Sequence, residues 1–355
     1  MMGVRGIVGS SVAAGVGVVA VAVGVKEVEK RLPPPAFSLN GERFNMKTMQ
    51  GRFAKQLTNC DPATLLASKE DIRGAEGLLK EFKEGKLDRA VHSDEELWAA
   101  RKLVESAIHP DTKEIIPEPF RMSGYVPFNG PVCVAMMASS STPALLFWNW
   151  VNQSQNALVN YFNRNASSPT SNETLAVSYS AAVGAALVMA FGLSQAITRT
   201  QSPAKAARLM KFVAFPSSIV ASCSNCYIMR RPEISGGATI TDKEGNVLAN
   251  GLRSSIAAAK AVEETVVSRA ILQVPTFLVP AVCMSLPPIA ALTASFPAVS
   301  VPLTTLMTIV SFGFGLPAAV AYFPQVGSLD VEDLEPELRA LLDENVTEVF
   351  YNKGL

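Results

Sequence analysis

The stretch Asn149-Trp-Val-Asn-Gln-Ser-Gln-Asn-Ala-Leu-Val-Asn-Tyr-Phe-Asn-Arg-Asn165 decides how the rest of the chain is interpreted. Its carboxamides recur at steps of three and four residues, which places them on one face of a helix. The residues on this amide face are Asn149, Asn152, Gln153, Asn156, Asn160 and Asn163. The opposite face carries apolar side chains, namely Trp148, Val151, Leu158, Val159 and Phe162.

No acidic or basic residue lies between Arg121 and Arg164, so the amide face ends a long uncharged run. In a soluble protein, a face of this kind would be solvated. In a bilayer each amide needs a hydrogen-bond partner, so the face indicates either a polar cavity or a seam between helices. The sequence leaves both alternatives open.

Charged residues are scarce, and their absence is concentrated in a few runs. They make up 17% of the 355 residues, against roughly 25% in soluble domains. A bilayer-spanning helix needs about 20 largely apolar residues. The uncharged runs are Met122–Asn163, Thr174–Thr198, Phe212–Met229 and Ala270–Leu329. The first three runs each fit one helix and the last fits two, which predicts an all-α membrane protein with about five transmembrane helices.

Prolines interrupt several of these helices. The last uncharged run contains Pro275, Pro280, Pro287, Pro288, Pro297, Pro302, Pro317 and Pro324. In transporters, helices broken in this way expose backbone polar groups to a cavity. The alternative is that the kinks only shape the packing between helices.

The chain divides into four expected parts. Residues 1–35 form an apolar extension, which is a removable signal, an extra anchor or the product of a misassigned start. Residues 36–121 form a soluble helical segment, in which Ser68 with Asp71 predicts a capping box. Residues 122–329 form the transmembrane domain, with a soluble hairpin and helix near 230–269. Residues 330–355 form a tail with one amphipathic helix that begins near Pro336.

The loop after the second predicted span carries Arg199, Lys205, Arg208 and Lys211 and no acidic residue. By the positive-inside rule this loop should face the matrix, if the membrane is mitochondrial. The N-terminal segment would then also face the matrix, and the C-terminus would lie on the opposite side.

Several classes of function have no support in the sequence. Basic and acidic residues balance at 31 each, so no nucleic-acid partner is indicated. Cys223-Ser-Asn-Cys226 stands without a second ligand pair, so we expect no metal site. We find no nucleophile–base pair and no glycine-rich phosphate loop, so we expect neither an enzyme nor a cofactor.

His109-Pro-Asp-Thr112 follows a predicted helix, which ends there because proline disfavours helical backbone in the residue before it. Two interpretations stay open. The segment is a structural turn in which Asp111 or Thr112 caps the chain. Alternatively, His109, Pro110, Asp111 and Thr112 form a gate or a substrate contact at the mouth of a transport path.

Taken in order, the motifs resemble those of the sideroflexins, a family of mitochondrial inner-membrane proteins. The resemblance extends from Phe37 to Leu355 and leaves residues 1–35 outside. The chain departs from the family pattern at Gln155, where an aromatic residue is usual, and at Phe162, where a small hydroxyl residue is usual. The motifs that carry the resemblance are Gly51-Arg52, Asp61-Pro62, His109-Pro-Asp-Thr112, Asn152–Asn165, Asn225-Cys-Tyr-Ile-Met-Arg230, Asp242-Lys-Glu-Gly-Asn246, Glu264-Thr-Val-Val-Ser-Arg269, Phe323-Pro-Gln325 and Tyr351-Asn-Lys-Gly-Leu355.

The resemblance implies a transporter that moves small neutral amino acids into the matrix for one-carbon metabolism. Serine is the foremost substrate, and alanine, cysteine and glycine are further candidates. Amides offer both donors and acceptors without a fixed charge, which suits a zwitterion. The expected substrate-binding residues are Asn152, Gln153, Asn156, Asn160, Asn163, Arg164 and Asn165.

An assembly factor for respiratory-complex or iron–sulfur and haem biogenesis, without transport of its own, is the alternative function. An intact amide face and broken helices favour transport, because a scaffold needs neither feature. A tricarboxylate substrate is disfavoured, because it would call for Arg or Lys within the spans.

Overall fold

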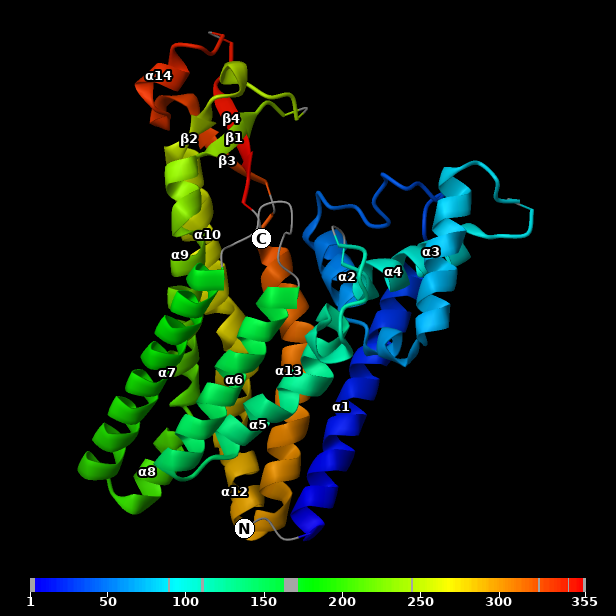
Figure 1. Ribbon diagram of the computed structural model, residues 1–355. Helices are drawn as coiled ribbons and strands as arrows, with labels where there is room; N and C mark the ends of the chain where they lie inside the picture. Colours follow the sequence, from blue (N-terminus) through cyan, green and yellow to red (C-terminus); the bar gives the residue numbers. More distant parts are fainter. Residues whose placement is uncertain are drawn as a thin grey trace.

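The computed structural model describes residues 4–88, 90–109, 112–162, 172–243, 245–324, 326–343 and 345–353. It shows a bundle of long helices that carries two small domains at one end (Figure 1). The helices that build the bundle are α1 (Val4–Arg31), α5 (Gly130–Ala138), α6 (Thr142–Phe162), α7 (Asn172–Thr200), α8 (Pro203–Met210), α9 (Ala214–Gly236), α10 (Ser255–Gln273), α11 (Val279–Ser285), α12 (Pro287–Ser295) and α13 (Pro297–Tyr322).

Five segments of the described chain are long and apolar enough to cross a membrane, as the sequence predicts. They are Ser10–Arg31, Ala176–Thr200, Pro203–Gly236, Ser255–Ser285 and Pro297–Tyr322. The number agrees with the expectation, but the set differs. The N-terminal helix α1 is included, and no segment from the uncharged run 122–163 is.

The run 122–162 folds as a helical hairpin and not as one span, which corrects the sequence-based assignment. A π-helical turn (Tyr125–Asn129) leads into α5, which ends at Ser139, where the backbone becomes extended. The chain then reverses into α6. Small hydroxyl residues at 139–142, followed by Pro143, end the first helix and start the second, because neither favours a continuous helix.

This hairpin adds a reversal of the chain and so changes the expected orientation. The N-terminal domain and the C-terminal sheet lie at the same end of the bundle, whereas α8 with its basic residues lies at the other end (Figure 1). The sequence-based expectation placed the C-terminus opposite the N-terminal segment, and the basic loop on the same side as that segment. Both expectations are wrong, because they counted one span where the chain makes two helical legs.

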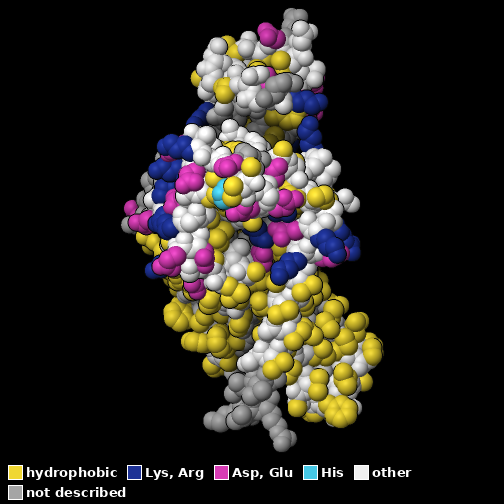
Figure 2. Space-filling view, turned by 90° about the vertical axis from the view of Figure 1, so that its right-hand side faces the viewer, with side chains coloured by type: hydrophobic (Ala, Val, Ile, Leu, Met, Phe, Trp, Pro, Cys, Tyr) yellow, Lys and Arg dark blue, Asp and Glu magenta, His cyan; other side chains and the backbone are white. Residues whose placement is uncertain are grey.

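The surface supports this arrangement. Hydrophobic side chains cover the lower half of the molecule, and charged side chains gather on the N-terminal domain above it (Figure 2). A charged zone above an apolar zone is the distribution expected of a protein whose bundle lies in a bilayer.

The N-terminal domain is built from α2 (Met49–Asn59), α3 (Lys69–Lys83) and α4 (Asp94–Ala107). The predicted capping box is present: Asp71 N donates to Ser68 Oγ at 3.1 Å, and Ser68 N donates to Asp71 Oδ2 at 2.9 Å. These two bonds satisfy backbone donors that a helix N-terminus leaves free. The helix that the sequence predicts after Ser68 is therefore confirmed.

Helix α1 packs along α13 through glycines that leave no room for a side chain. A Cβ atom on Gly313 would lie 2.2 Å from Val21, and one on Gly17 would lie 2.5 Å from Ile309. Val21 and Val25 are fully buried, while Val12 and Val19 on the other side of α1 are about 60% exposed. The helix thus presents one face to α13 and an apolar face outward, as an anchor within a bilayer does.

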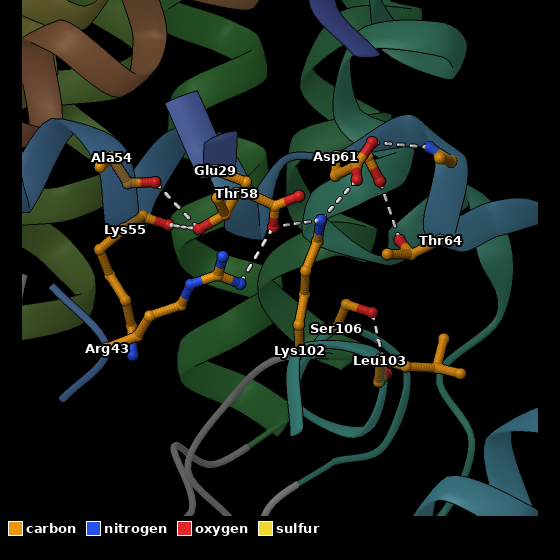
Figure 3. Close-up of polar contacts among 11 residues, drawn as sticks. Glu29, Arg43, Ala54, Lys55, Thr58, Asp61, Thr64, Lys102, Leu103 and Ser106 are labelled. Carbon is orange, nitrogen blue, oxygen red and sulfur yellow. Dashed lines mark hydrogen bonds and ion pairs between the residues drawn. The ribbon is translucent and has the colours of Figure 1, made fainter. Parts of the chain in front are cut away.

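An ion-pair network joins α1 to the N-terminal domain (Figure 3). Glu29 at the end of α1 pairs with Arg43 at 3.2 Å and with Lys102 of α4 at 3.0 Å. Lys102 also pairs with the buried carboxylate of Asp61 at 2.6 Å. The network fixes where the domain sits on the bundle.

The C-terminal tail differs from the sequence expectation. Its amphipathic helix is present but short, as α14 (Pro336–Arg339). The tail mainly contributes β3 (Val326–Asp330) and β4 (Glu348–Asn352). These pair with β1 (Ala238–Thr241) and β2 (Arg253–Ser254) from the loop between α9 and α10, in one antiparallel sheet of order β2-β1-β4-β3. Two segments that the sequence suggested were separate therefore share one core.

Candidate functional site

The amide face of α6 points into the bundle. Asn149, Asn152 and Gln153 are at most 5% exposed. Phe147, Trp150, Leu158 and Tyr161, on the outward side of the same helix, are each more than 40% exposed. The helix is therefore polar inside and apolar outside, the reverse of a helix on the surface of a soluble protein.

One end of the amide face forms a seam with neighbouring helices. Asn149 Nδ2 donates to the Leu145 carbonyl at 2.8 Å, and Ser217 of α9 donates to Asn149 Oδ1 at 3.3 Å. The hydroxyls of Thr142 and Ser194 of α7 are 3.2 Å apart. These hydrogen bonds satisfy Asn149 within the protein, so this residue has a structural role.

Toward the other end, the amides meet the π-helical turn (Tyr125–Asn129). The Tyr125 hydroxyl donates to Asn156 Oδ1 at 3.3 Å. Asn129, in the same turn, is 1% exposed, and its Oδ1 atom is buried without a hydrogen-bond partner. Proline at position 127 cannot donate a backbone hydrogen bond, which favours the wider turn at this place.

Two further amides of the face, Asn152 and Gln153, make no side-chain hydrogen bond to the residues that the structure describes. Both are buried, at 3% and 5% exposure. A buried amide without a partner costs free energy, about 1–3 kcal/mol. Such groups suit contact with a polar solute that enters and leaves.

Arg269 of α10 brings a positive charge to the same region. Its guanidinium interacts electrostatically with Tyr125 and with Cys226 on α9. Within the described ranges no carboxylate pairs with Arg269, whereas Arg230 on α9 pairs with Glu233 at 2.7 Å. In the sequence analysis, Arg269 is only the last residue of the Glu264–Arg269 motif and has no role assigned to it.

Arg121 and Ser123 lie just before the π-helical turn and are also incompletely satisfied. Arg121 is 4% exposed, and its Nε donates to the Ile116 carbonyl at 2.7 Å, while Nη1 has no partner. Burial lowers the pKa of the Arg121 guanidinium from its ordinary value. Ser123 Oγ is likewise buried without a partner.

The remaining predicted substrate contacts are placed only in part. Asn160 belongs to α6 by its backbone, but its side chain lies outside the described residues, as do Asn163, Arg164 and Asn165. The two departures from the family pattern lie away from the amide face. Gln155 donates to the Pro119 carbonyl at 2.8 Å, and Phe162 stacks on Phe120 with ring centres 4.7 Å apart.

The segment at His109 forms a closed turn where it is described. His109 N donates to the Glu114 carbonyl at 2.9 Å, and Thr112 N donates to His109 Nδ1 at 3.2 Å. Lys113 has a positive φ of 59°. These contacts are typical of a structural turn, and the gate stays a hypothesis. Pro110 and Asp111 lie outside the described residues.

The cysteines offer little reactive chemistry. All five are free thiols. Burial raises the pKa of the Cys60 thiol to about 12, so this group stays protonated at neutral pH. Among the described residues, no group of three or more His, Cys, Asp or Glu side chains could hold a metal ion.

A shallow hollow of about 220 Å³ lies on the outward side of α6, between α7 and α9. Ala157, Leu158, Tyr161, Tyr179 and Asn225 contribute to its mostly apolar lining. It lies beside the amide face and does not open onto it, because Leu158 and Tyr161 belong to the apolar side of the helix.

Comparisons with known proteins place this architecture in a family. The sideroflexin family model matches residues 38–355. Human sideroflexin-5 is 37% identical over 324 residues, which is 90% of this chain and 94% of that protein. A Dictyostelium discoideum sideroflexin is 35% identical over 327 residues, covering 90% and 98%. Human sideroflexin-1 is 34% identical over 326 residues, covering 91% and 98%.

No solved structure matches the chain. The matched region begins after α1, so this helix lies outside the family model. Nearly the whole of the remaining chain is covered by the family model, and five segments can span a membrane. The chain is therefore a multi-pass membrane protein that belongs to the sideroflexin family.

Proposed function

We propose that this protein transports small neutral amino acids across the mitochondrial inner membrane, with serine as the preferred substrate for matrix one-carbon metabolism. Sideroflexins are a carrier-type family and not an enzyme family, which supports transport as the class of activity. The observation that carries the proposal is the amide face of α6, which is buried, uncharged and only partly satisfied.

The chemistry of this face suits a solute without net charge. Asn152, Gln153 and Asn156 offer donors and acceptors but no fixed charge, so they can bind a zwitterion and release it again. Asn152 and Gln153 are both buried and make no side-chain hydrogen bond to the described residues, so a polar solute can supply their partners. We propose these three residues as substrate contacts, together with Asn160, Asn163, Arg164 and Asn165.

The test is uptake of labelled L-serine into liposomes that contain only this purified protein. We expect saturable uptake that unlabelled alanine, cysteine and glycine inhibit. Asn152→Ala should reduce uptake per inserted molecule about tenfold, because one contact to the solute is lost. Gln155→Ala, which changes a residue outside the amide face, is the matched control and should retain uptake. Absence of uptake of any small amino acid would favour the non-transporting assembly factor.

A further inference from the structure

Two helices of the bundle are broken by the same device. The first break is the π-helical turn Tyr125–Asn129, which leads into α5, and the second is the π-helical turn Val274–Leu278, which leads into α11. Both short helices end where the backbone becomes extended, at Ser139 and at Leu286. The residues that the two breaks share in type and order are Val126-Pro127 with Pro131, and Val274-Pro275 with Pro280.

Both breaks lie against α13 at nearly the same depth. A Cβ atom on Gly130, directly after the first break, would lie 2.2 Å from Ile309 Cδ1. A Cβ atom on Gly315 would lie 2.1 Å from Pro275 Cβ in the second break. Residues 309 and 315 of one helix are separated by about 9 Å along its axis. The two breaks therefore pack on one short stretch of α13.

The second break is satisfied and held in place. Ser311 Oγ of α13 donates to the Pro275 carbonyl at 2.5 Å, and Thr276 Oγ1 donates to the Leu272 carbonyl at 3.1 Å. Within residues 274–285, all of which are described, no buried side-chain oxygen or nitrogen lacks a hydrogen-bond partner. The ring of Pro275 is rigid, so its close approach to Gly315 leaves it no room to shift.

The first break is not satisfied. In the described chain, eight buried side-chain oxygen or nitrogen atoms lack a hydrogen-bond partner, and three of them lie within residues 121–129, namely Arg121 Nη1, Ser123 Oγ and Asn129 Oδ1. The Tyr125 hydroxyl reaches Asn156 of α6 only at 3.3 Å. On α13, the atom that faces Gly130 is the end of a flexible isoleucine side chain, which can give way.

This difference has a consequence for the free energy of the structure. A buried polar atom without a partner raises the free energy of the conformation that contains it. A second conformation, in which water or a solute reaches that atom, then lies closer in free energy and is more populated. Because the penalty falls on the first break and not on the second, the first break is the one expected to move.

We propose that the first break is the moving gate of the solute path, that Asn129 lines the path when the gate opens, and that the second break is the fixed pivot on α13. The gate lies at the end of the bundle that carries the N-terminal domain (Figure 1). Two hydrogen bonds tie it to that domain, from Ile116 N to the Ala107 carbonyl at 2.8 Å and from Arg121 Nε to the Ile116 carbonyl at 2.7 Å. The gate rests on the proposed function, because it presupposes a solute that passes.

The first test is the reactivity of introduced cysteines. Asn129 is 1% exposed and Thr276 of the second break is 5% exposed, so the two positions form a matched pair. Asn129→Cys and Thr276→Cys, in nanodiscs that expose both membrane faces, are treated with a small water-soluble methanethiosulfonate and followed by mass spectrometry. We expect Asn129→Cys to react about tenfold faster or more, because only its surroundings open. The parent protein gives the background of the native thiols. Equal rates at the two positions would overturn the gate.

The second test compares uptake with stability. Pro127→Ala restores a backbone donor and favours a regular helix in place of the first break. It should lower serine uptake per inserted molecule about fivefold or more without lowering the melting temperature. Pro288→Ala is the matched control, because this proline lies in the first turn of α12 and breaks no helix. It should retain uptake.

Ser311→Ala tests the pivot. It removes the donor to the Pro275 carbonyl, so it should lower the melting temperature by about 2–4 °C and leave normalised uptake near the wild type. Ser285→Ala is the matched control, because its hydroxyl donates within its own helix to the Ala281 carbonyl at 2.7 Å. Loss of uptake in Ser311→Ala with full uptake in Pro127→Ala would assign the motion to the second break and overturn the proposal.

The outcomes distinguish the gate from the proposed function. If the wild type takes up serine while Asn129→Cys is unreactive and Pro127→Ala keeps its uptake, the gate is wrong and the transport function stands. If Asn129→Cys reacts and Thr276→Cys does not, while the wild type takes up no small amino acid, the moving break stands and the transport function fails. If Asn129→Cys does not accumulate, Pro127→Ala and Ser311→Ala decide.

Discussion

The seam between α1 and α13 and the amide face of α6 are both buried in the same bundle, yet they are built on opposite principles. The seam is apolar, and its glycines bring the helices so close that a Cβ atom at Gly313 would overlap Val21. The amide face is polar, and two of its buried members, Asn152 and Gln153, make no side-chain hydrogen bond within the described protein.

This difference separates the parts that hold the protein together from the parts that act. Close contact between helices maximises dispersion contacts, which individually are small and collectively large. Partly satisfied polar groups lower stability, and they are informative because most buried polar groups in proteins have partners. Mutations in the α1–α13 seam should therefore lower the stability of the protein. Mutations at Asn152, Gln153 and Asn156 of the amide face should instead lower transport.

The largest expected effect concerns membrane topology, because α1 can pack along α13 only if both helices cross the same bilayer. Cysteines introduced at the exposed Ser93 and Ser202 should react with a membrane-impermeant maleimide from opposite sides of sealed vesicles. Ser10→Cys should react only from the side of the vesicle membrane on which Ser202→Cys reacts. The parent protein, with its buried and half-buried thiols, gives the background. Labelling of Ser93→Cys and Ser202→Cys from one side would contradict the helical hairpin at 122–162.

The ion-pair network at the end of α1 should give the largest change in stability. Lys102→Ala leaves the buried carboxylate of Asp61 without its 2.6 Å partner. Removal of one member of a buried pair costs about 3 kcal/mol, because the remaining charge is poorly solvated. Unfolding of the detergent-purified protein measures this loss. Lys86→Ala, which removes an exposed pair with Glu84, is the control and should change stability by less than about 1 kcal/mol.

The glycines of the seam should give the next effect. Gly313→Leu cannot be accommodated beside Val21 without separating α1 from α13, and overpacking of this kind costs about 1–3 kcal/mol. Gly184→Leu on α7 is the matched control, because a Cβ atom there meets open space. Equal melting temperatures for the two variants would mean that α1 does not pack against α13 in the membrane.

The sequence predicted much of the helical structure because charge and apolar length report membrane burial directly. The uncharged run 174–198 coincides with a candidate span, and the face of α6 that points inward follows from steps of three and four residues. The capping box at Ser68 and Asp71 was predictable because it is local.

Features that depend on distant partners could not be predicted in this way. The 122–162 run lacks charge throughout, so charge alone does not reveal its reversal near Ser139. The four-stranded sheet joins residues near 240 to residues near 350, which no local pattern connects. The contact of Tyr125 with Asn156 depends on tertiary packing, which no local pattern in the sequence shows.

Within the amide face itself, two asparagines should behave differently. Asn156→Ala should lower serine uptake per inserted molecule about tenfold while the protein still accumulates, because one contact to the solute is lost. Asn149→Ala removes the hydrogen bond that joins α6 to Ser217 of α9. Such interhelical hydrogen bonds average only about 0.6 kcal/mol in membranes. Asn149→Ala should reduce thermal stability slightly and leave normalised uptake unchanged. The reverse pattern would move the substrate path toward Asn149 and α9.

The smallest effect is expected at the Cys223–Cys226 pair, which lies on α9. The Cys223 thiol donates to the Val266 carbonyl at 3.5 Å, and the buried Cys226 interacts electrostatically with Arg269. Serine can make both contacts through its hydroxyl, so the double change Cys223→Ser and Cys226→Ser should leave folding and serine uptake near the wild type. Elemental analysis of the purified protein completes the test, because loss of a bound metal in the double serine variant would contradict a purely structural pair.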